Sequence, residues 1–157
     1  MIWQLPTLGA TEEWARQFAL LAPVPGVVYL RGELGAGKTA LARALIHALG
    51  YAAAVRSPTY TLVEEYDTAA GVVLHFDLYR LTEAEELEYI GLRDYLGMPA
   101  LWLVEWPERA LDCLPPADLQ VRMSLAEAGA HQLQARASSP RGEGWLAALP
   151  GTTGVIR

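Results

Sequence analysis

Cysteine occurs once in this 157-residue chain, as Cys113, so the sequence excludes internal disulfide bonds and cysteine-rich metal sites. No segment approaches the ~18 uninterrupted apolar residues that a membrane-spanning helix needs. The first residues, Met1-Ile2-Trp3-Gln4-Leu5-Pro6, lack the basic start and the apolar core of a secretory signal. These absences predict a cytoplasmic protein with no membrane segment.

Clustered positive charge is also missing. The net charge is −6, and the basic residues are scattered along the chain with no run of adjacent ones. A protein that grips a nucleic-acid backbone on its own usually carries a basic stripe, so any contact with nucleic acid is expected to be indirect. The length and the 52% of hydrophobic residues predict a single domain over residues 1–157, with a sizeable core.

Lysine, too, occurs only once, as Lys38, whereas every other basic residue is an arginine. This lysine lies in Gly32-Glu33-Leu34-Gly35-Ala36-Gly37-Lys38-Thr39, which matches the phosphate-binding P-loop pattern G-x-x-x-x-G-K-[ST]. A compact, flexible ammonium group can reach between phosphate oxygens, a role that the planar arginine side chain does not fill. At the residue frequencies of this chain, a chance match is expected less than roughly once in a thousand such chains.

The segments on either side of the motif support a phosphate site. Residues 27–30 form a short apolar run typical of a buried strand. Apolar residues recur at helical spacing after the motif, and Gly50 is placed to end that helix. Inward-turned N–H groups and the helix N-terminus would together bind an anion. The candidate nucleotide-binding residues are Glu33, Leu34, Gly35, Ala36, Gly37, Lys38 and Thr39, with Lys38 at the β- and γ-phosphates and the Thr39 hydroxyl on Mg²⁺.

Asparagine is absent altogether. Guanine-specific GTPases of the Ras type read their base with an Asn-Lys-x-Asp loop, which this chain cannot contain. We therefore expect the nucleotide to be ATP, bound with Mg²⁺.

The rest of the chain alternates between strand and helix patterns. We expect a first helix capped by Thr11, a capping box at Thr82-Glu83-Ala84-Glu85 that opens a short helix, and another short helix at Trp145. Strands are expected at residues 61–66, 72–77, 101–105, 119–125 and 133–137. The last two of these alternate in the manner of an antiparallel pair, and the final residues are expected to be loose. This pattern predicts a three-layer α/β fold: a P-loop NTPase-like mixed sheet with flanking helices and C-terminal antiparallel strands.

Two acids are candidates for the metal. A P-loop enzyme needs an acid near Thr39 to hold Mg²⁺, usually at the carboxyl end of a neighbouring strand. Glu105 ends the most apolar run of the chain, and Asp77 ends another. The spacing does not decide which acid binds the metal and which acts on water. His75, just before Asp77, is interpreted as a hydrogen-bonded, partly buried residue, and Trp106 and the tyrosines as packing residues.

Ser57-Pro58-Thr59 follows the P-loop helix, where nucleotide-sensing switch segments often lie. Thr59 is a candidate for contact with the γ-phosphate or the metal. The alternative is a plain loop held by Pro58.

Four segments, taken together, resemble the signature blocks of the TsaE family in order and spacing, and they span residues 32–108. They are the P-loop, Ser57-Pro58-Thr59-Tyr60-Thr61-Leu62-Val63, His75-Phe76-Asp77-Leu78-Tyr79-Arg80-Leu81 and Leu103-Val104-Glu105-Trp106-Pro107-Glu108. TsaE proteins are bacterial ATPases of the tRNA threonylcarbamoyladenosine pathway. The resemblance therefore implies ATP hydrolysis with a TsaB–TsaD complex that modifies the adenosine 3′ of the anticodon.

The resemblance also implies a role for each candidate residue. Glu105 would accompany Thr39 at Mg²⁺, and Asp77 would act in hydrolysis with Lys38. Ser57 and Thr59 would belong to a switch-like segment.

The late hairpin departs from the family. Members can carry a basic residue after its glycine, where this chain has Gly129-Ala130-His131. That difference removes support for a nucleotide contact from the hairpin.

Two other classes of function share the P-loop. A small-metabolite kinase would need an acceptor pocket and usually an arginine-bearing lid, and no clear lid is present in the sequence. A non-catalytic adaptor would use ATP only to set its conformation. Phosphate transfer to added acceptors distinguishes the kinase, and single-turnover hydrolysis distinguishes the adaptor.

Overall fold

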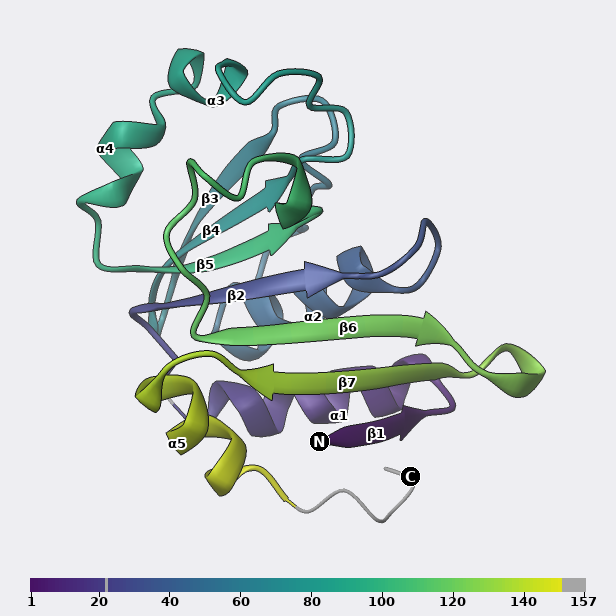
Figure 1. Ribbon diagram of the computed structural model, residues 1–157. Coiled ribbons are helices and arrows are strands. Elements are labelled where there is room, and N and C mark those ends of the chain that lie inside the picture. The colour runs from purple at the N-terminus through teal and green to yellow at the C-terminus, as the bar shows by residue number, and fades with distance from the viewer. Residues whose placement is uncertain (22, 151–157) are drawn as a thin grey trace.

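The computed structural model describes residues 1–21 and 23–150. Its strands form one seven-stranded sheet in the order β1-β7-β6-β2-β5-β4-β3 (Figure 1). The strands are β1 (Ile2–Leu5), β2 (Gly26–Arg31), β3 (Val63–Thr68), β4 (Gly71–Asp77), β5 (Ala100–Glu105), β6 (Leu119–Leu125) and β7 (His131–Ala137). The helices are α1 (Leu8–Ala19), α2 (Lys38–Ala48), α3 (Glu86–Tyr89), α4 (Leu92–Leu96) and α5 (Pro140–Ala148), with two 3₁₀ turns, η1 (Pro107–Arg109) and η2 (Glu127–Gly129). No described helix is long and apolar enough to cross a membrane.

The sheet is mixed, which confirms the expected fold class. Its central strand β2 runs parallel to β5 on one side and to β6 on the other, and β4 runs parallel to β5. The remaining pairs, β3–β4, β6–β7 and β1–β7, are antiparallel. The C-terminal antiparallel pair is therefore present as expected. The carboxyl ends of β2, β4 and β5 meet at one edge of the sheet, as parallel strands require.

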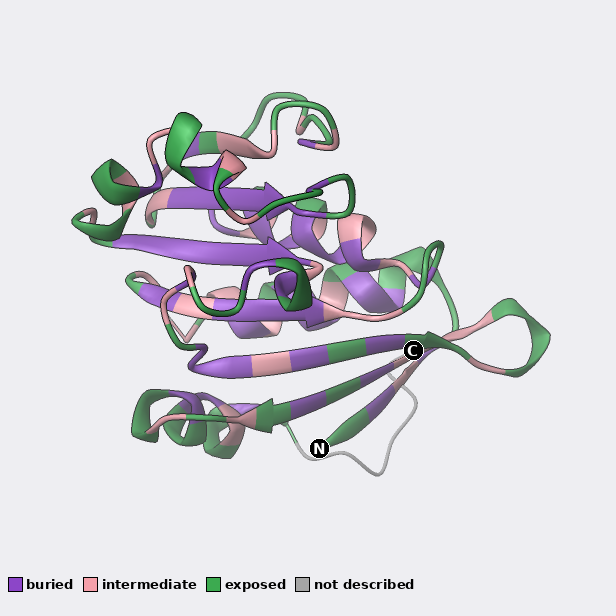
Figure 2. Ribbon diagram, turned by 45° about the horizontal axis from the view of Figure 1, so that its top comes forward, coloured by how far each residue is buried: buried purple, intermediate pink, exposed green. Residues whose placement is uncertain are grey.

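Alternation along the strands divides the core into two layers. On one face, Leu101 and Leu103 of β5 pack with residues of α1, α2 and α5, including Phe18. On the other face, Trp102 and Val104 pack with α3, α4 and the segment 106–117. Figure 2 shows the buried central strands between these layers. Because side chains alternate, Glu105, two residues after Leu103, points toward the face on which α2 lies.

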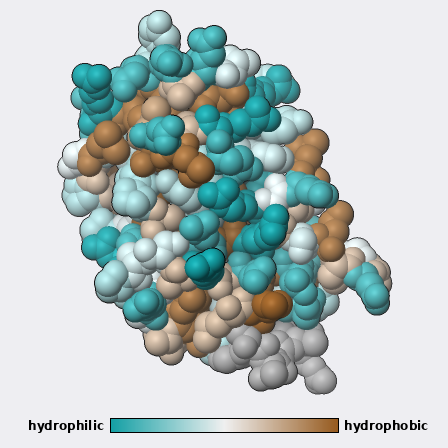
Figure 3. All heavy atoms as spheres, viewed as in Figure 1, coloured by the Kyte–Doolittle hydropathy of each residue, from teal (hydrophilic) through white to brown (hydrophobic). Residues whose placement is uncertain are grey.

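On the face of the sheet that is turned away from α1 and α2, no described helix covers β6 and β7 (Figure 1). There β6 and β7 present polar side chains, among them the exposed Arg122, Gln134 and Arg136. Hydrophilic residues accordingly cover much of this part of the surface (Figure 3).

Several element boundaries differ from the sequence predictions. The N-cap of α1 is Thr7, whose Oγ1 accepts the Ala10 N–H at 3.1 Å, whereas Thr11 is buried inside the helix. The capping box closes on Glu86 rather than on Glu85, since Glu86 Oε1 accepts the Thr82 N–H at 3.0 Å.

Strand β3 begins at Val63, two residues later than expected. Leu62 has a φ of +66°, which a strand does not allow, and its N–H donates to Pro58 O at 2.8 Å. Strand β1 was not predicted at all, and the expectation of a loose C-terminus concerns residues 151–157, outside the described residues.

Candidate functional site

The P-loop connects β2 to α2 and depends on its glycines. Gly32, Gly35 and Gly37 have φ values of +141°, +80° and +98°, a region that residues with a Cβ rarely adopt. Gly37 is the N-cap of α2, and no side chain caps this helix. The free N–H groups and the partial positive charge of the helix N-terminus therefore face the loop, which makes this end of α2 suited to an anion.

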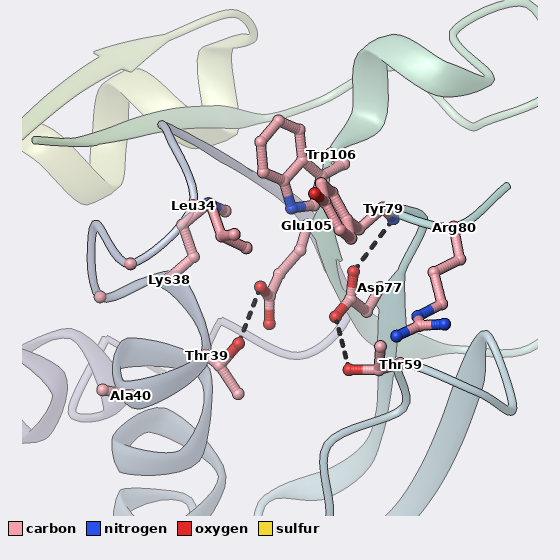
Figure 4. A pocket seen from close by; sticks show the side chains of 12 residues that line it. Leu34, Lys38, Thr39, Ala40, Thr59, Asp77, Tyr79, Arg80, Glu105 and Trp106 are labelled. Atoms are coloured by element: carbon pink, nitrogen blue, oxygen red, sulfur yellow. Dashed lines mark hydrogen bonds between the residues drawn. The ribbon is translucent and has the colours of Figure 1, made fainter.

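A cavity of about 470 Å³ opens beside the loop (Figure 4). The predicted site residues that line it are Leu34, Gly35, Gly37, Lys38, Thr39, Thr59, Asp77 and Glu105. Three other candidates do not line it. Glu33 lines a neighbouring hollow, Ala36 is buried with 1% of its surface exposed, and Ser57 connects to the cavity only through Thr59.

Lys38 enters the cavity from the P-loop side. Its side chain is nearly buried, and its Nζ donates to Gly32 O and Glu33 O, both at 2.8 Å. The ammonium group also lies 4.3 Å from the centre of the Trp106 ring. Burial lowers the pKa of Lys38, and the nearby Glu105 and Asp77 carboxylates oppose that shift. Within the described residues no carboxylate forms an ion pair with this ammonium group, so its charge is available to a bound anion.

Glu105 is buried at the end of β5 and is held through both carboxylate oxygens. The Thr39 hydroxyl donates to Oε2 at 2.9 Å, which joins the end of β5 to the first turn of α2. His75 Nε2 lies 2.8 Å from Oε1. The structure thus brings together the threonine and the acid expected to share a metal ion.

Asp77 ends β4 and lies directly beside Glu105 in the parallel register of β4 and β5. Its Oδ2 accepts the Thr59 hydroxyl at 3.2 Å, and its Oδ1 accepts the Tyr79 N–H at 3.1 Å. Since the Thr59 proton points at Asp77, the Ser57 hydroxyl donates to Thr59 Oγ1, at 2.7 Å. Burial is the main cause that raises the pKa of Asp77, and the two hydrogen bonds oppose it. The segment around Thr59 is therefore tied to the acid of the neighbouring strand.

These residues fit a magnesium-bound nucleotide. The uncapped end of α2 and the unpaired ammonium of Lys38 suit phosphate oxygens. Thr39 and Glu105 supply the hard oxygen ligands that Mg²⁺ prefers, and this ion usually takes only one or two carboxylates from a protein. Among the described residues there is no cluster of three or more His, Cys, Asp or Glu side chains that could hold a metal ion by itself.

Sequence reasoning missed four residues that line the cavity: Ala40, Tyr79, Arg80 and Trp106. The rings of Tyr79 and Trp106 are 5.0 Å apart, and the Arg80 guanidinium lies 4.6 Å from the centre of the Tyr60 ring. Trp106 has a φ of +57°, an uncommon value for an aromatic residue. Position in the sequence was the available signal: Ala40 follows the P-loop, Trp106 follows Glu105, and Tyr79 and Arg80 follow Asp77 within three residues.

The late hairpin approaches the loop without lining the cavity. A Cβ on Gly37 would lie 3.3 Å from His131 Nδ1, yet residues 129–131 are not among those that line the cavity. A nucleotide contact from this hairpin therefore stays without support.

Comparisons with known proteins place this geometry in a family. Residues 5–134 match the model of a family described as threonylcarbamoyl adenosine biosynthesis protein TsaE. A tRNA threonylcarbamoyladenosine biosynthesis protein TsaE from Haemophilus influenzae is 50% identical over 62% of this chain, and the match spans 61% of that relative. The Bacillus subtilis protein of the same name is 33% identical over 79% of this chain and 77% of the relative.

A solved structure shares the fold. The crystal structure of Bacillus subtilis YdiB matches with a TM-score of 0.78 and 27% identity, over 94% of this chain and 91% of that one. The family match covers most of the chain and includes the P-loop, both acids and the segment between them. The chain therefore belongs to the TsaE family of threonylcarbamoyl adenosine biosynthesis proteins.

Proposed function

We propose that this protein is a Mg²⁺-dependent ATPase that serves the biosynthesis of threonylcarbamoyladenosine in tRNA. The observation that carries the proposal is the hydrogen bond of 2.9 Å between Thr39 and Glu105, across the cavity that Lys38 enters. This bond joins a P-loop hydroxyl to a strand-end carboxylate, the two oxygen donors with which P-loop enzymes hold Mg²⁺. The absence of asparagine, and with it of a guanine-reading loop, supports ATP as the nucleotide.

Each residue has one role in this proposal. Lys38 and the N–H groups of residues 35–39 bind the phosphates, while Thr39 and Glu105 hold the metal. Mg²⁺, when bound, neutralises negative charge on the phosphate oxygens. Asp77 orients the attacking water or accepts a proton from that water, because burial raises the pKa of its carboxyl toward the range of a general base. Ser57 and Thr59 connect the switch-like segment to Asp77, so this segment responds to the state of the nucleotide.

The proposed partner is a TsaB–TsaD complex in the cytoplasm, with tRNA contacted only indirectly. The support for indirect contact is the net charge of −6 without a basic run, since few phosphates could be neutralised. The expected result is weak binding of labelled tRNA by the isolated protein at ~0.15 M salt. Tight, salt-sensitive binding by the protein alone would contradict the indirect contact.

The direct test of the ATPase is a measurement of ADP and phosphate release by the protein alone, and with TsaB and TsaD homologues and tRNA. Hydrolysis is expected to be slow alone and to change when the partners are added. Release of ADP with stoichiometric transfer to an added metabolite would show a kinase instead. If no ATP is hydrolysed in a single-turnover experiment with all partners present, the protein is a nucleotide-sensing adaptor.

Partner binding should depend on the nucleotide. A titration of the TsaB–TsaD complex against the protein, with a non-hydrolysable ATP analogue and then with ADP, measures this dependence. Equal affinities in the two states would rule out the switch role of Ser57 and Thr59.

A further inference from the structure

His75 is a fully buried histidine beside Glu105, and it does not line the proposed nucleotide cavity. It lies on β4, paired with Leu103 of β5, two residues before Asp77. Its neighbour on the same face, Val73, belongs to the apolar layer packed against α1 and α2. An apolar side chain would therefore suit this position, and the presence of an imidazole needs an explanation.

The hydrogen bonds of the ring supply that explanation. A carboxylate only accepts hydrogen bonds, so His75 Nε2 carries the proton and donates to Glu105 Oε1 at 2.8 Å. The other ring nitrogen, Nδ1, is buried and has no hydrogen-bond partner in the described structure. A buried polar atom without a partner typically costs about 1–3 kcal/mol. The imidazole is thus a costly group whose ring makes one hydrogen bond in the described structure, and its partner is the proposed metal ligand.

The contact has a geometric effect on Glu105. With only the Thr39 bond, the carboxylate could rotate about its terminal torsion, which is broad for Glu. With His75 on Oε1 and Thr39 on Oε2, both oxygens are fixed, and Oε2 stays beside the Thr39 hydroxyl at 2.9 Å. The two oxygen donors are therefore held beside each other in this structure.

We propose that His75 is a positioning residue that holds the Glu105 carboxylate in the orientation that receives Mg²⁺. This inference rests on the proposed function, since it takes Glu105 as a metal ligand. His75 acts through Glu105 and touches neither nucleotide nor water in the cavity. Residues that orient metal ligands in this way are typically worth ~10- to 100-fold in metal affinity.

The test measures the binding of a fluorescent, non-hydrolysable ATP analogue while Mg²⁺ is titrated. His75→Leu is expected to raise the Mg²⁺ concentration at half-saturation ~10- to 100-fold, and to leave the affinity for the analogue without Mg²⁺ unchanged. His75→Gln keeps an N–H donor and should restore most of the wild-type value. His47→Leu removes the exposed histidine of α2 and serves as the matched control, with no change expected.

Glu105→Gln separates a failure of this inference from a failure of the proposed function. If Glu105→Gln leaves the Mg²⁺ dependence unchanged, the metal role of Glu105 is wrong. If Glu105→Gln raises the Mg²⁺ requirement and His75→Leu does not, only the role of His75 is wrong. Equal loss in His75→Leu with and without Mg²⁺ would also overturn it, because that result indicates a general packing defect.

A measurement on the wild-type protein keeps the inference testable if His75→Leu does not fold. In ¹⁵N NMR spectra of the imidazole rings, His75 Nε2 should carry a proton, because it donates to Glu105 Oε1. Adding Mg²⁺ to the analogue-bound protein should shift its Nε2 resonance and leave that of His47 in place. The Nδ1–H tautomer, or an Nε2 resonance that Mg²⁺ does not move, would refute the positioning role.

Discussion

Replacement of Lys38 by methionine tests the phosphate site most directly. Methionine keeps an unbranched, apolar stem and removes the ammonium group, with its charge and its hydrogen-bond donors. In the structure the ammonium group is nearly buried and has no carboxylate ion pair among the described residues, so its charge acts on a bound phosphate with little competition. Two unit charges about 4 Å apart interact by about 4 kcal/mol at an effective dielectric constant of ~20.

Part of that energy is offset in the wild-type protein. The Lys38 ammonium already donates to Gly32 O and Glu33 O, and some of its solvation by these carbonyls is lost when phosphate arrives. We therefore expect Lys38→Met to weaken ATP binding by ~2–4 kcal/mol, or roughly 30- to 1000-fold.

Isothermal titration with a non-hydrolysable ATP analogue at fixed Mg²⁺ measures this loss. Arg43→Met removes a positive charge from an exposed position of the same helix, and its affinity should stay close to that of the wild type. Thermal unfolding without nucleotide shows that both variants are folded. An affinity of Lys38→Met within threefold of wild type, or an equal loss in Arg43→Met, would refute the assignment of the phosphate site.

Three further variants test catalysis, the loop and the core. Asp77→Asn should bind the ATP analogue normally but hydrolyse ATP at least ~100-fold more slowly in single turnovers. Because burial raises the pKa of Asp77, ionised Asp77 destabilises the folded protein above that raised pKa, and the effect is absent below the ordinary aspartate pKa. Asp77→Asn should therefore unfold at a higher temperature than wild type at pH 7 and at the same temperature at pH 3. Gly32→Ala should lose ~1–3 kcal/mol or more in urea unfolding, because a Cβ there would collide with the Met123 carbonyl oxygen, whereas Gly35→Ala, with open space around it, should lose only ~1–2 kcal/mol for its positive φ. Phe18→Ala should lose ~3–5 kcal/mol in the same assay, since the ring is fully buried, and a loss below ~1 kcal/mol would show that the core closes over it.

The local elements of the phosphate site were predictable from the sequence. A buried strand, glycines at positive φ and a helix with an apolar face each leave a pattern within a few residues, and β2 and α2 confirm it. The alternation at β6 and β7 likewise predicted an antiparallel pair. Patterns of this kind depend on neighbours in the sequence, so they survive without knowledge of the tertiary structure.

Contacts between distant strands were not predictable in the same way. The pairing of β6 with β2, and of His75 with Glu105, joins segments far apart in the chain, and no local pattern encodes the choice. Strand β1 is only four residues long, too short for its alternation to be distinguished from chance. The choice between the two acids as the proposed metal ligand also needed more than spacing. The likeness to a known family predicted the pairing of Thr39 with Glu105, whereas the sequence pattern alone left Asp77 equally possible.

The pairing of β1 with β7 has a consequence for the newborn chain. Leu5 pairs with His131, so the partner of β1 is synthesised 126 residues later (131 − 5). At ~5–20 residues per second, the first strand waits roughly 6–25 s for its neighbour. During that time β2, β4 and β5 are all synthesised, before β1 has a strand to pair with. Trp3 can pack early against Trp14 of α1, but the backbone of β1 has no strand to pair with until β7 is made, which leaves this strand open to chaperones and to misassembly during translation.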